Sequence, residues 1–122
     1  MSDTKRMKSL LIEALCIASK TGDIEKVKSL VKMGVNINSE NDSGDLPLNL
    51  ASEAGQLEMV KLLVASGGSV NQGCEDMNNT PLWHACMKGH MKVVKFLLSA
   101  GASPNILNCG NQGPLYLSLI HI

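Results

Sequence analysis

The sequence predicts an all-α repeat solenoid, in which short helix-turn-helix units stack in a row. One segment, TPLWHACMKGHMKVVKFLLSAGASPN at residues 80–105, repeats the pattern LPLNLASEAGQLEMVKLLVASGGSVN at residues 46–71. Single residues recur at the same spacing of 33 or 34 positions: Asn38, Asn71 and Asn105; Gly34, Gly67 and Gly101; Gly22, Gly55 and Gly89; Ala18, Ala51 and Ala85. Each unit also carries one apolar stripe at helical spacing, which a single unit cannot bury alone, so neighbouring units must stack.

The first helix of a unit is clearest in residues 80–89. Thr80 can cap the free N–H groups at the helix start, and Pro81 fits the first turn because its missing N–H is not needed there. Ala85 and Cys86 are small, which lets neighbouring units approach closely. Gly89 is expected to end the helix in a left-handed conformation.

The second helix follows directly and carries an apolar stripe at i, i+3, i+6 and i+7. The stripe residues in the three units are Met91, Val94, Leu97 and Leu98; Leu57, Val60, Leu63 and Val64; and Ile24, Val27, Leu30 and Val31. Gly101 is expected to stop the last of these helices before a polar, turn-rich loop.

These residues carry a family resemblance. TPLWHA followed by KGHMKVVKFLLSAGASPN resembles the ankyrin repeat, whose pattern is T-P-L-H-x-A in a 33-residue period, and LPLNLA and GPLYLS are weaker versions. The resemblance covers roughly residues 10–118 and implies stacked helix-turn-helix repeats joined by β-hairpin loops. The first unit departs from the pattern, because it has no T-P-L-H and its first helix carries charged residues. It is similar to an N-terminal capping repeat, whose outer face meets water.

The predicted organisation has five parts. Residues 1–9 form a flexible N-terminal segment, 10–38 the capping repeat, 39–71 the second repeat, 72–105 the third, and 106–122 a truncated fourth repeat. The fourth unit stops inside its first helix, so we expect a truncated reading frame. The last residues, SLIHI, resemble translated adaptor sequence and are not expected to be native.

Composition argues against several functions. Eleven basic and eleven acidic residues cancel, and only Trp83, Phe96 and Tyr116 are aromatic, which disfavours nucleic-acid binding. No stretch approaches the roughly 20 apolar residues of a membrane span, and no signal peptide is evident. We therefore expect a cytoplasmic protein, with a nuclear location as the alternative, that inserts into no membrane. Its cysteines, Cys16, Cys74, Cys86 and Cys109, are expected to be free thiols.

A catalytic or metal site was considered at His84, Cys86 and His90. On the repeat template Cys86 is a small packing residue, and His90 occupies the position after the interhelix glycine, where ankyrin repeats often use histidine to hydrogen-bond the turn. A zinc site requires ligands that converge tetrahedrally, whereas residues 84 and 86 point to different faces of a helix. We predict that the chain is no enzyme, takes no small-molecule substrate and needs no cofactor; a metal protein at these three residues is the remote alternative.

The recurrent asparagines permit two interpretations. In the family, an asparagine at this position can be hydroxylated by a cytosolic asparaginyl hydroxylase, which makes Asn38, Asn71 and Asn105 candidate sites. The acidic residue usual two places earlier is absent here. The favoured interpretation is structural: each asparagine hydrogen-bonds the adjoining loop backbone.

The resemblance implies a protein–protein interaction module that acts as an adaptor, scaffold or inhibitor. Family members usually bind partners on a concave face made of loop tips and first helices. The residues that map there are Asp42, Ser43, Asp45, Glu53, Ala54, Glu75, Asp76, Met77, Asn79, Trp83, Met87 and Lys88. Trp83 is either an anchor of this patch or a packing residue against the next unit.

Charge supports a partner with a basic or polar segment. The acidic residues of this surface oppose lysines on the second helices, so one face is expected to be acidic and the other basic. Solvated loop charges with no partner are the alternative. A further alternative is that the chain is the N-terminal recognition region of a larger enzyme or channel.

Overall fold

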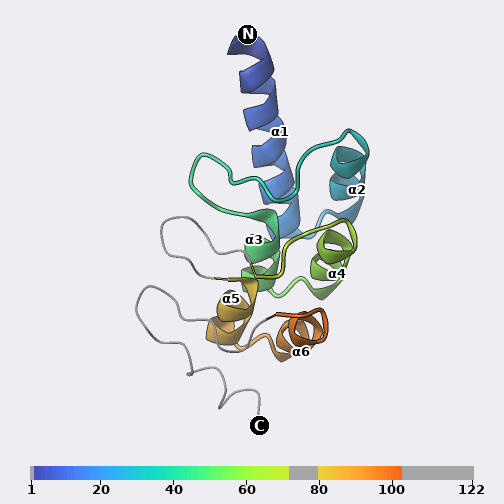
Figure 1. Ribbon diagram of the computed structural model, residues 1–122, viewed down its shortest axis with the longest axis vertical. Helices are drawn as coiled ribbons and strands as arrows, with labels where there is room; N and C mark the ends of the chain where they lie inside the picture. Colours follow the sequence, from blue (N-terminus) through green and yellow to red (C-terminus); the bar gives the residue numbers. More distant parts are fainter. Residues whose placement is uncertain (1, 72–79, 103–122) are drawn as a thin grey trace.

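The computed structural model describes residues 2–71 and 80–102, with side chains from Lys5 onward. It contains α1 (Ser2–Thr21), α2 (Ile24–Lys32), α3 (Pro47–Ala54), α4 (Leu57–Ala65), α5 (Pro81–Lys88) and α6 (Met91–Ser99). The helices stack as three pairs, with α1, α3 and α5 in one layer and α2, α4 and α6 in the other (Figure 1). The loop between α2 and α3 projects beyond the first helices. We call the side of α1, α3, α5 and this loop the loop face, and the side of α2, α4 and α6 the second-helix face.

The ends of the first helices follow the predicted chemistry. The Thr80 side chain accepts a hydrogen bond from the Trp83 N–H at 3.3 Å, and Pro81 occupies the first turn. Gly55 and Gly89 end α3 and α5 with φ of 73° and 75°, in the left-handed region that glycine adopts without strain. The all-α repeat fold predicted from the spacing is therefore confirmed.

A single apolar core runs through all three helix pairs. The predicted stripe supplies part of it, since Val94 and Leu97 are fully buried and Met91 is only partly so. The core also includes positions that were not predicted, among them the one that Met59 and Val93 occupy at 1% exposure. The first unit has the exposed Lys26 in that register. The exposure of this register in α2 and its burial in α4 and α6 indicate that it faces the preceding unit of the stack.

The helix α1 is longer than the other five. It begins at Ser2, so residues 2–9, which sequence analysis assigned to a flexible segment, form its first turns. Ser9 Oγ lies 3.3 Å from Asp42 Oδ1, which links these turns to the loop between α2 and α3. None of the described helices is both long enough and apolar enough to span a membrane.

The loop between α2 and α3 is closed by turns. Its tip is held by the Asn41 N–H, which donates to the Asp45 carbonyl at 2.9 Å, and by the Asn41 side chain, which accepts from the Ser43 and Asp45 N–H groups. Within residues 2–71 and 80–102 no strand is present, although the family resemblance implied β-hairpins. The Asn41 carboxamide provides hydrogen bonds that a paired strand would otherwise supply, as in an Asx turn.

Successive loops are joined by the recurrent asparagines. Asn38 Nδ2 donates to the Gly67 carbonyl at 3.1 Å, while Asn38 Oδ1 accepts from the Ser69 N–H at 2.9 Å. In the next unit Asn71 Nδ2 donates to the Gly101 carbonyl at 3.3 Å. The structural interpretation of these asparagines is therefore confirmed at Asn38 and Asn71. Asn105 lies outside the described residues.

Candidate protein-binding surface

The exposed tip of the first loop carries part of the predicted site. Asp42 and Ser43 are exposed, whereas Asp45 is half-buried. The Asp45 carbonyl accepts from the Cys16 thiol at 3.7 Å, so its backbone anchors the loop to α1. The loop is thus fixed at its base while two side chains at its tip remain accessible. This arrangement suits recognition by a preformed surface, because little ordering is needed on binding.

The ends of α3 and α5 carry a second part of the site. Ala54, Met87 and Lys88 are exposed, and Met87 leaves 54% of its surface in contact with solvent. Met87 and Lys88 lie next to Gly89 in one unit, as Glu53 and Ala54 lie next to Gly55 in the preceding one. The repeat therefore places matching residues of successive units along the same face. Glu75, Asp76, Met77 and Asn79 lie outside the described residues.

Glu53 contacts the following unit as well as facing solvent. Its Oε2 atom lies 3.8 Å from His84 Nδ1, and its backbone carbonyl lies 2.9 Å from His90 Nε2. Because a carbonyl can only accept, His90 Nε2 must carry the proton and donate. The His90 ring also covers Gly55, where an added Cβ would lie 2.7 Å from it. Glu53 was predicted on the binding surface, and its contacts with the following unit were not predicted from the sequence.

Burial governs the ionisation of His84. Its side chain is 17% exposed, and desolvation lowers its pKa below the usual 6.5, while the Glu53 carboxylate acts in the opposite direction. Its Nε2 atom is buried without a hydrogen-bond partner in the described part of the chain. Neutral imidazole is therefore the form that this environment favours.

Trp83 is half-buried beside His84. The two rings meet edge to face, with centroids 5.2 Å apart and an interplanar angle of 87°. This contact restrains the indole, while part of its surface remains accessible.

The three residues considered for a metal site serve the stack instead. Cys86 is 3% exposed in the core, His84 is half-buried against Glu53 and Trp83, and His90 Nε2 donates to a carbonyl. No group of three or more histidine, cysteine, aspartate or glutamate side chains suited to a metal ion occurs in residues 5–71 and 80–102.

The two described thiols are poor nucleophiles. Burial raises the pKa of Cys16 to about 12, with Glu13 and Asp45 adding to the effect, and burial raises the pKa of Cys86 to about 11. Both are free and buried. Since the thiolate is the reactive form, neither residue is suited to covalent catalysis.

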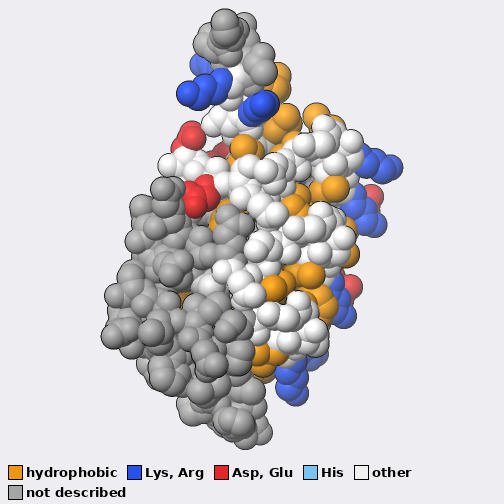
Figure 2. Space-filling view, in the orientation of Figure 1, with side chains coloured by type: hydrophobic (Ala, Val, Ile, Leu, Met, Phe, Trp, Pro, Cys, Tyr) orange, Lys and Arg blue, Asp and Glu red, His pale blue; other side chains and the backbone are white. Residues whose placement is uncertain are grey.

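The charge distribution differs between the two faces. Figure 2 shows Lys and Arg side chains along the edge formed by α2, α4 and α6, and acidic side chains on the loop side below α1. Two lysines of the second-helix face have acidic neighbours: Lys28 lies 3.9 Å from Glu25, and Lys61 lies 3.7 Å from Glu58. In α6 the position of these glutamates is occupied by Lys92, next to Lys95. The positive charge of the second-helix face is therefore partly neutralised by glutamates on α2 and α4, whereas α6 carries lysines without such neighbours among the described residues.

Comparison with known families agrees with this architecture. The family model described as ankyrin repeats (3 copies) matches residues 13–116, while no individual curated protein sequence matches the chain. Ankyrin repeats generally mediate protein–protein interaction and are typically non-catalytic. The match covers most of the chain and includes all three described helix pairs apart from the first turns of α1. The chain belongs to the ankyrin-repeat family.

Proposed function

We propose that the chain is an adaptor, scaffold or inhibitor that binds a partner protein on its loop face. One observation carries the proposal: the side chains of Asp42, Ser43, Ala54, Met87 and Lys88 are exposed on a frame that has a buried apolar core. Surface loops on a rigid scaffold commonly carry recognition. The fold itself does not identify the partner, so the chemistry of these side chains must.

The partner segment would be basic or polar next to the loop tip. Asp42 supplies an exposed carboxylate there, and the half-buried Asp45 and Glu53 add negative charge nearby. Such charges guide association and orient a partner more than they add to affinity. Exposed apolar surface at Met87 would supply the desolvated part of the contact, which usually contributes most of the binding energy.

The test begins with a partner recovered by using the whole chain as bait and then purified. Its affinity is measured by calorimetry for the unmodified chain, for Asp42→Lys and for Met87→Asp. Each substitution should weaken binding about 10-fold or more, equivalent to about 1.4 kcal/mol. Asp42→Lys should also change the dependence of affinity on salt, because it reverses an exposed charge.

Matched variants on the opposite face provide the control. Lys61→Glu and Lys95→Glu alter exposed charges of α4 and α6, and they should leave the affinity unchanged. If these two variants weaken binding while Asp42→Lys and Met87→Asp do not, the partner uses the second-helix face and the proposal is wrong. Circular dichroism of all four variants would show that the stack is intact.

A further inference from the structure

The joints between units show how one loop binds the next. At the first joint the Asn38 carboxamide donates to the Gly67 carbonyl and accepts from the Ser69 N–H, at 3.1 and 2.9 Å. The residue before it, Ile37, is buried at 7% exposure. The carboxamide of one unit therefore pairs with two backbone groups of the next, and the apolar residue before it is part of the core.

The first unit has the same carbonyl and N–H groups, but no other unit precedes it in the described part of the chain. Gly34 and Asn36 lie 33 positions before Gly67 and Ser69. Among the described residues, neither the Gly34 carbonyl nor the Asn36 N–H makes a protein hydrogen bond. An acceptor and a donor in the register that binds asparagine are thus accessible at this end of the stack.

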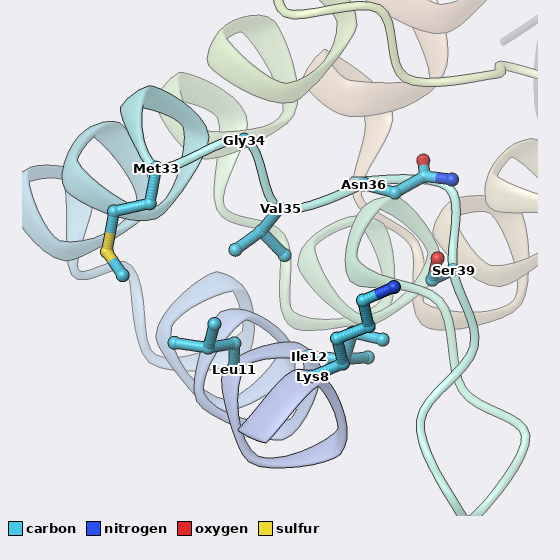
Figure 3. Close-up of a pocket in the computed structure, with 8 residues that line it drawn as sticks. All are labelled: Lys8, Leu11, Ile12, Met33, Gly34, Val35, Asn36 and Ser39. Atoms are coloured by element: carbon cyan, nitrogen blue, oxygen red, sulfur yellow. The ribbon is translucent and has the colours of Figure 1, made fainter. Parts of the chain in front are cut away.

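A hollow lies directly beside these two groups. It measures about 430 Å³ and is lined by Lys8, Leu11, Ile12, Met33, Gly34, Val35, Asn36 and Ser39. In Figure 3 the Val35 and Leu11 side chains point toward each other across it, and Lys8 extends toward Ser39 at its rim. Met33 leaves 63% of its surface exposed at the edge. The hollow therefore offers apolar walls next to the free backbone pair.

Other parts of the same end differ from this hollow. Lys26 stands in the register of the buried Met59 and Val93, which makes that position of α2 suitable for water. Asp23 occupies the register of Gln56 and His90, which reach back to the preceding unit. Instead of reaching back, the Asp23 carboxylate accepts from the Lys26 N–H at 3.2 Å and caps its own helix. The loop edge at residues 34–36 shows no comparable adaptation.

We propose that this hollow and the Gly34–Asn36 edge bind a segment of a different protein that carries an apolar residue followed by asparagine. The asparagine would pair with the Gly34 carbonyl and the Asn36 N–H, as Asn38 pairs with Gly67 and Ser69. The apolar residue would enter the space between Leu11, Ile12 and Val35. The interface is continuous with the joints already present in the stack. A carboxylate after the asparagine would meet the Lys8 ammonium, which has no ion-pair partner within the described residues.

The experiment uses the whole ¹⁵N-labelled chain and a synthetic peptide, Gly-Val-Asn-Ile-Asn-Ser-Glu-Asn, that copies residues 34–41. The expected result is saturable shifts of the amide signals of residues 34–36, with a Kd of roughly millimolar order because the peptide is short. A peptide with aspartate in place of its second asparagine keeps the shape and loses the donor. It should bind at least five-fold more weakly.

Two matched protein variants locate the contact. Met33→Asp changes an exposed methionine at the hollow, and Met87→Asp changes an exposed methionine on α5, so neither disturbs the core. The first should weaken peptide binding several-fold and the second should not. Absence of saturable shifts, equal binding of the aspartate peptide, or equal effects of the two variants would each overturn the proposal. Self-association of the chain alone through the same amides would identify a second copy as the occupant and overturn the assignment to a different protein.

Discussion

Cys16 and Cys86 place ionisable thiols inside the stack. Cys16 donates to the Asp45 carbonyl, and Cys86 packs in the core next to Ala85. Burial at both positions keeps the thiol protonated, because the thiolate would lose its hydration. Each cysteine is therefore a packing residue, and its thiol can react only when the local structure opens.

Alkaline pH should lower the free energy of unfolding through these thiols. The folded-state pKa values, about 12 for Cys16 and about 11 for Cys86, lie above the ordinary thiol pKa of 9.0. The folded chain thus retains protons that the unfolded chain releases, so stability is complete below pH 9.0 and falls as pH rises toward 11 and 12. Urea unfolding at about pH 7.5 and about pH 10 would measure the loss.

A Cys16→Ala/Cys86→Ala double variant provides the control, since it removes both titrating groups. Its stability should depend less on pH across the same interval. Iodoacetamide should modify Cys16 and Cys86 slowly in the folded chain and rapidly in urea, with the sites resolved by mass spectrometry. Equal alkylation rates in both states would contradict the burial of these thiols.

His84 should lower the free energy of unfolding at acidic pH. Its pKa is lowered by burial, so the unfolded chain takes up a proton at a pH where the folded chain does not. Stability is therefore fully present above pH 6.5 and falls as pH decreases through and below that value. NMR titration of the imidazole should give a pKa below 6.5, and unfolding at about pH 5.5 should require less urea than at about pH 7.5. In His84→Gln the difference should shrink; an unchanged difference would assign it to other groups.

At the scale of helices and turns, a comparison of Gly55 with Gly89 tests one contact between units. Both residues have nearly the same left-handed φ, 73° and 75°. A Cβ at Gly55 would lie 2.7 Å from the His90 ring, whereas no described atom lies within 4 Å of a Cβ at Gly89. Alanine at Gly89 should cost only the backbone strain, about 1–2 kcal/mol. Alanine at Gly55 should cost about 1 kcal/mol more, because the His90–Glu53 hydrogen bond is displaced.

Chemical denaturation of Gly55→Ala and Gly89→Ala would measure the two costs. A third variant, Gly55→Ala/His90→Ala, tests the cause, since removing the ring should relieve part of the additional cost. If Gly55→Ala and Gly89→Ala lose equal stability, the His90 ring can move aside without a penalty and the contact has no role in joining the units.

The helices could be predicted from the sequence because their determinants are local. Thr80, Pro81 and Gly89 define one helix within a few residues, and the fixed spacing transfers the same limits to the other units. The asparagine joints were also expected. Partners of Glu53 and His90 could not be predicted, because the contact joins residues 37 positions apart through a backbone carbonyl. Repeat spacing indicates that units stack, but it does not indicate which side chains cross the joint.

The binding surface could be predicted less completely from the sequence than the helices. Asp42 and Met87 are exposed as expected, yet Glu53, placed on the same surface, also faces His84. Exposure depends on the residues of the next unit, which are far away in the sequence. The length of α1 was missed for a related reason: its first turns are charged, and the Ser9–Asp42 contact with a distant loop is not visible in a local pattern.

At the scale of the whole molecule, stability depends on contacts between neighbours. The helix α3 lies between α1 and α5 and packs against both (Figure 1). In such a stack the total stability is approximately a sum of unit and interface contributions, and three units are near the minimum that folds. The middle pair, α3 and α4, takes part in both interfaces, so its loss should separate the outer pairs.

The substitution Leu63→Ala tests this arrangement. Leu63 lies in α4, is fully buried and belongs to the continuous core. Removing its side-chain atoms should cost about 2–5 kcal/mol, a large fraction of the stability of a domain of this size. Because both interfaces involve the middle pair, hydrogen exchange should show lost protection in α1–α2 and α5–α6 as well as in α3–α4. The partly buried Leu62 is the matched control, and Leu62→Ala should reduce protection less in all three pairs. If α1–α2 keeps its protection in Leu63→Ala while α3–α4 loses it, the first pair is stable alone, and cooperation between neighbours does not explain how this chain folds.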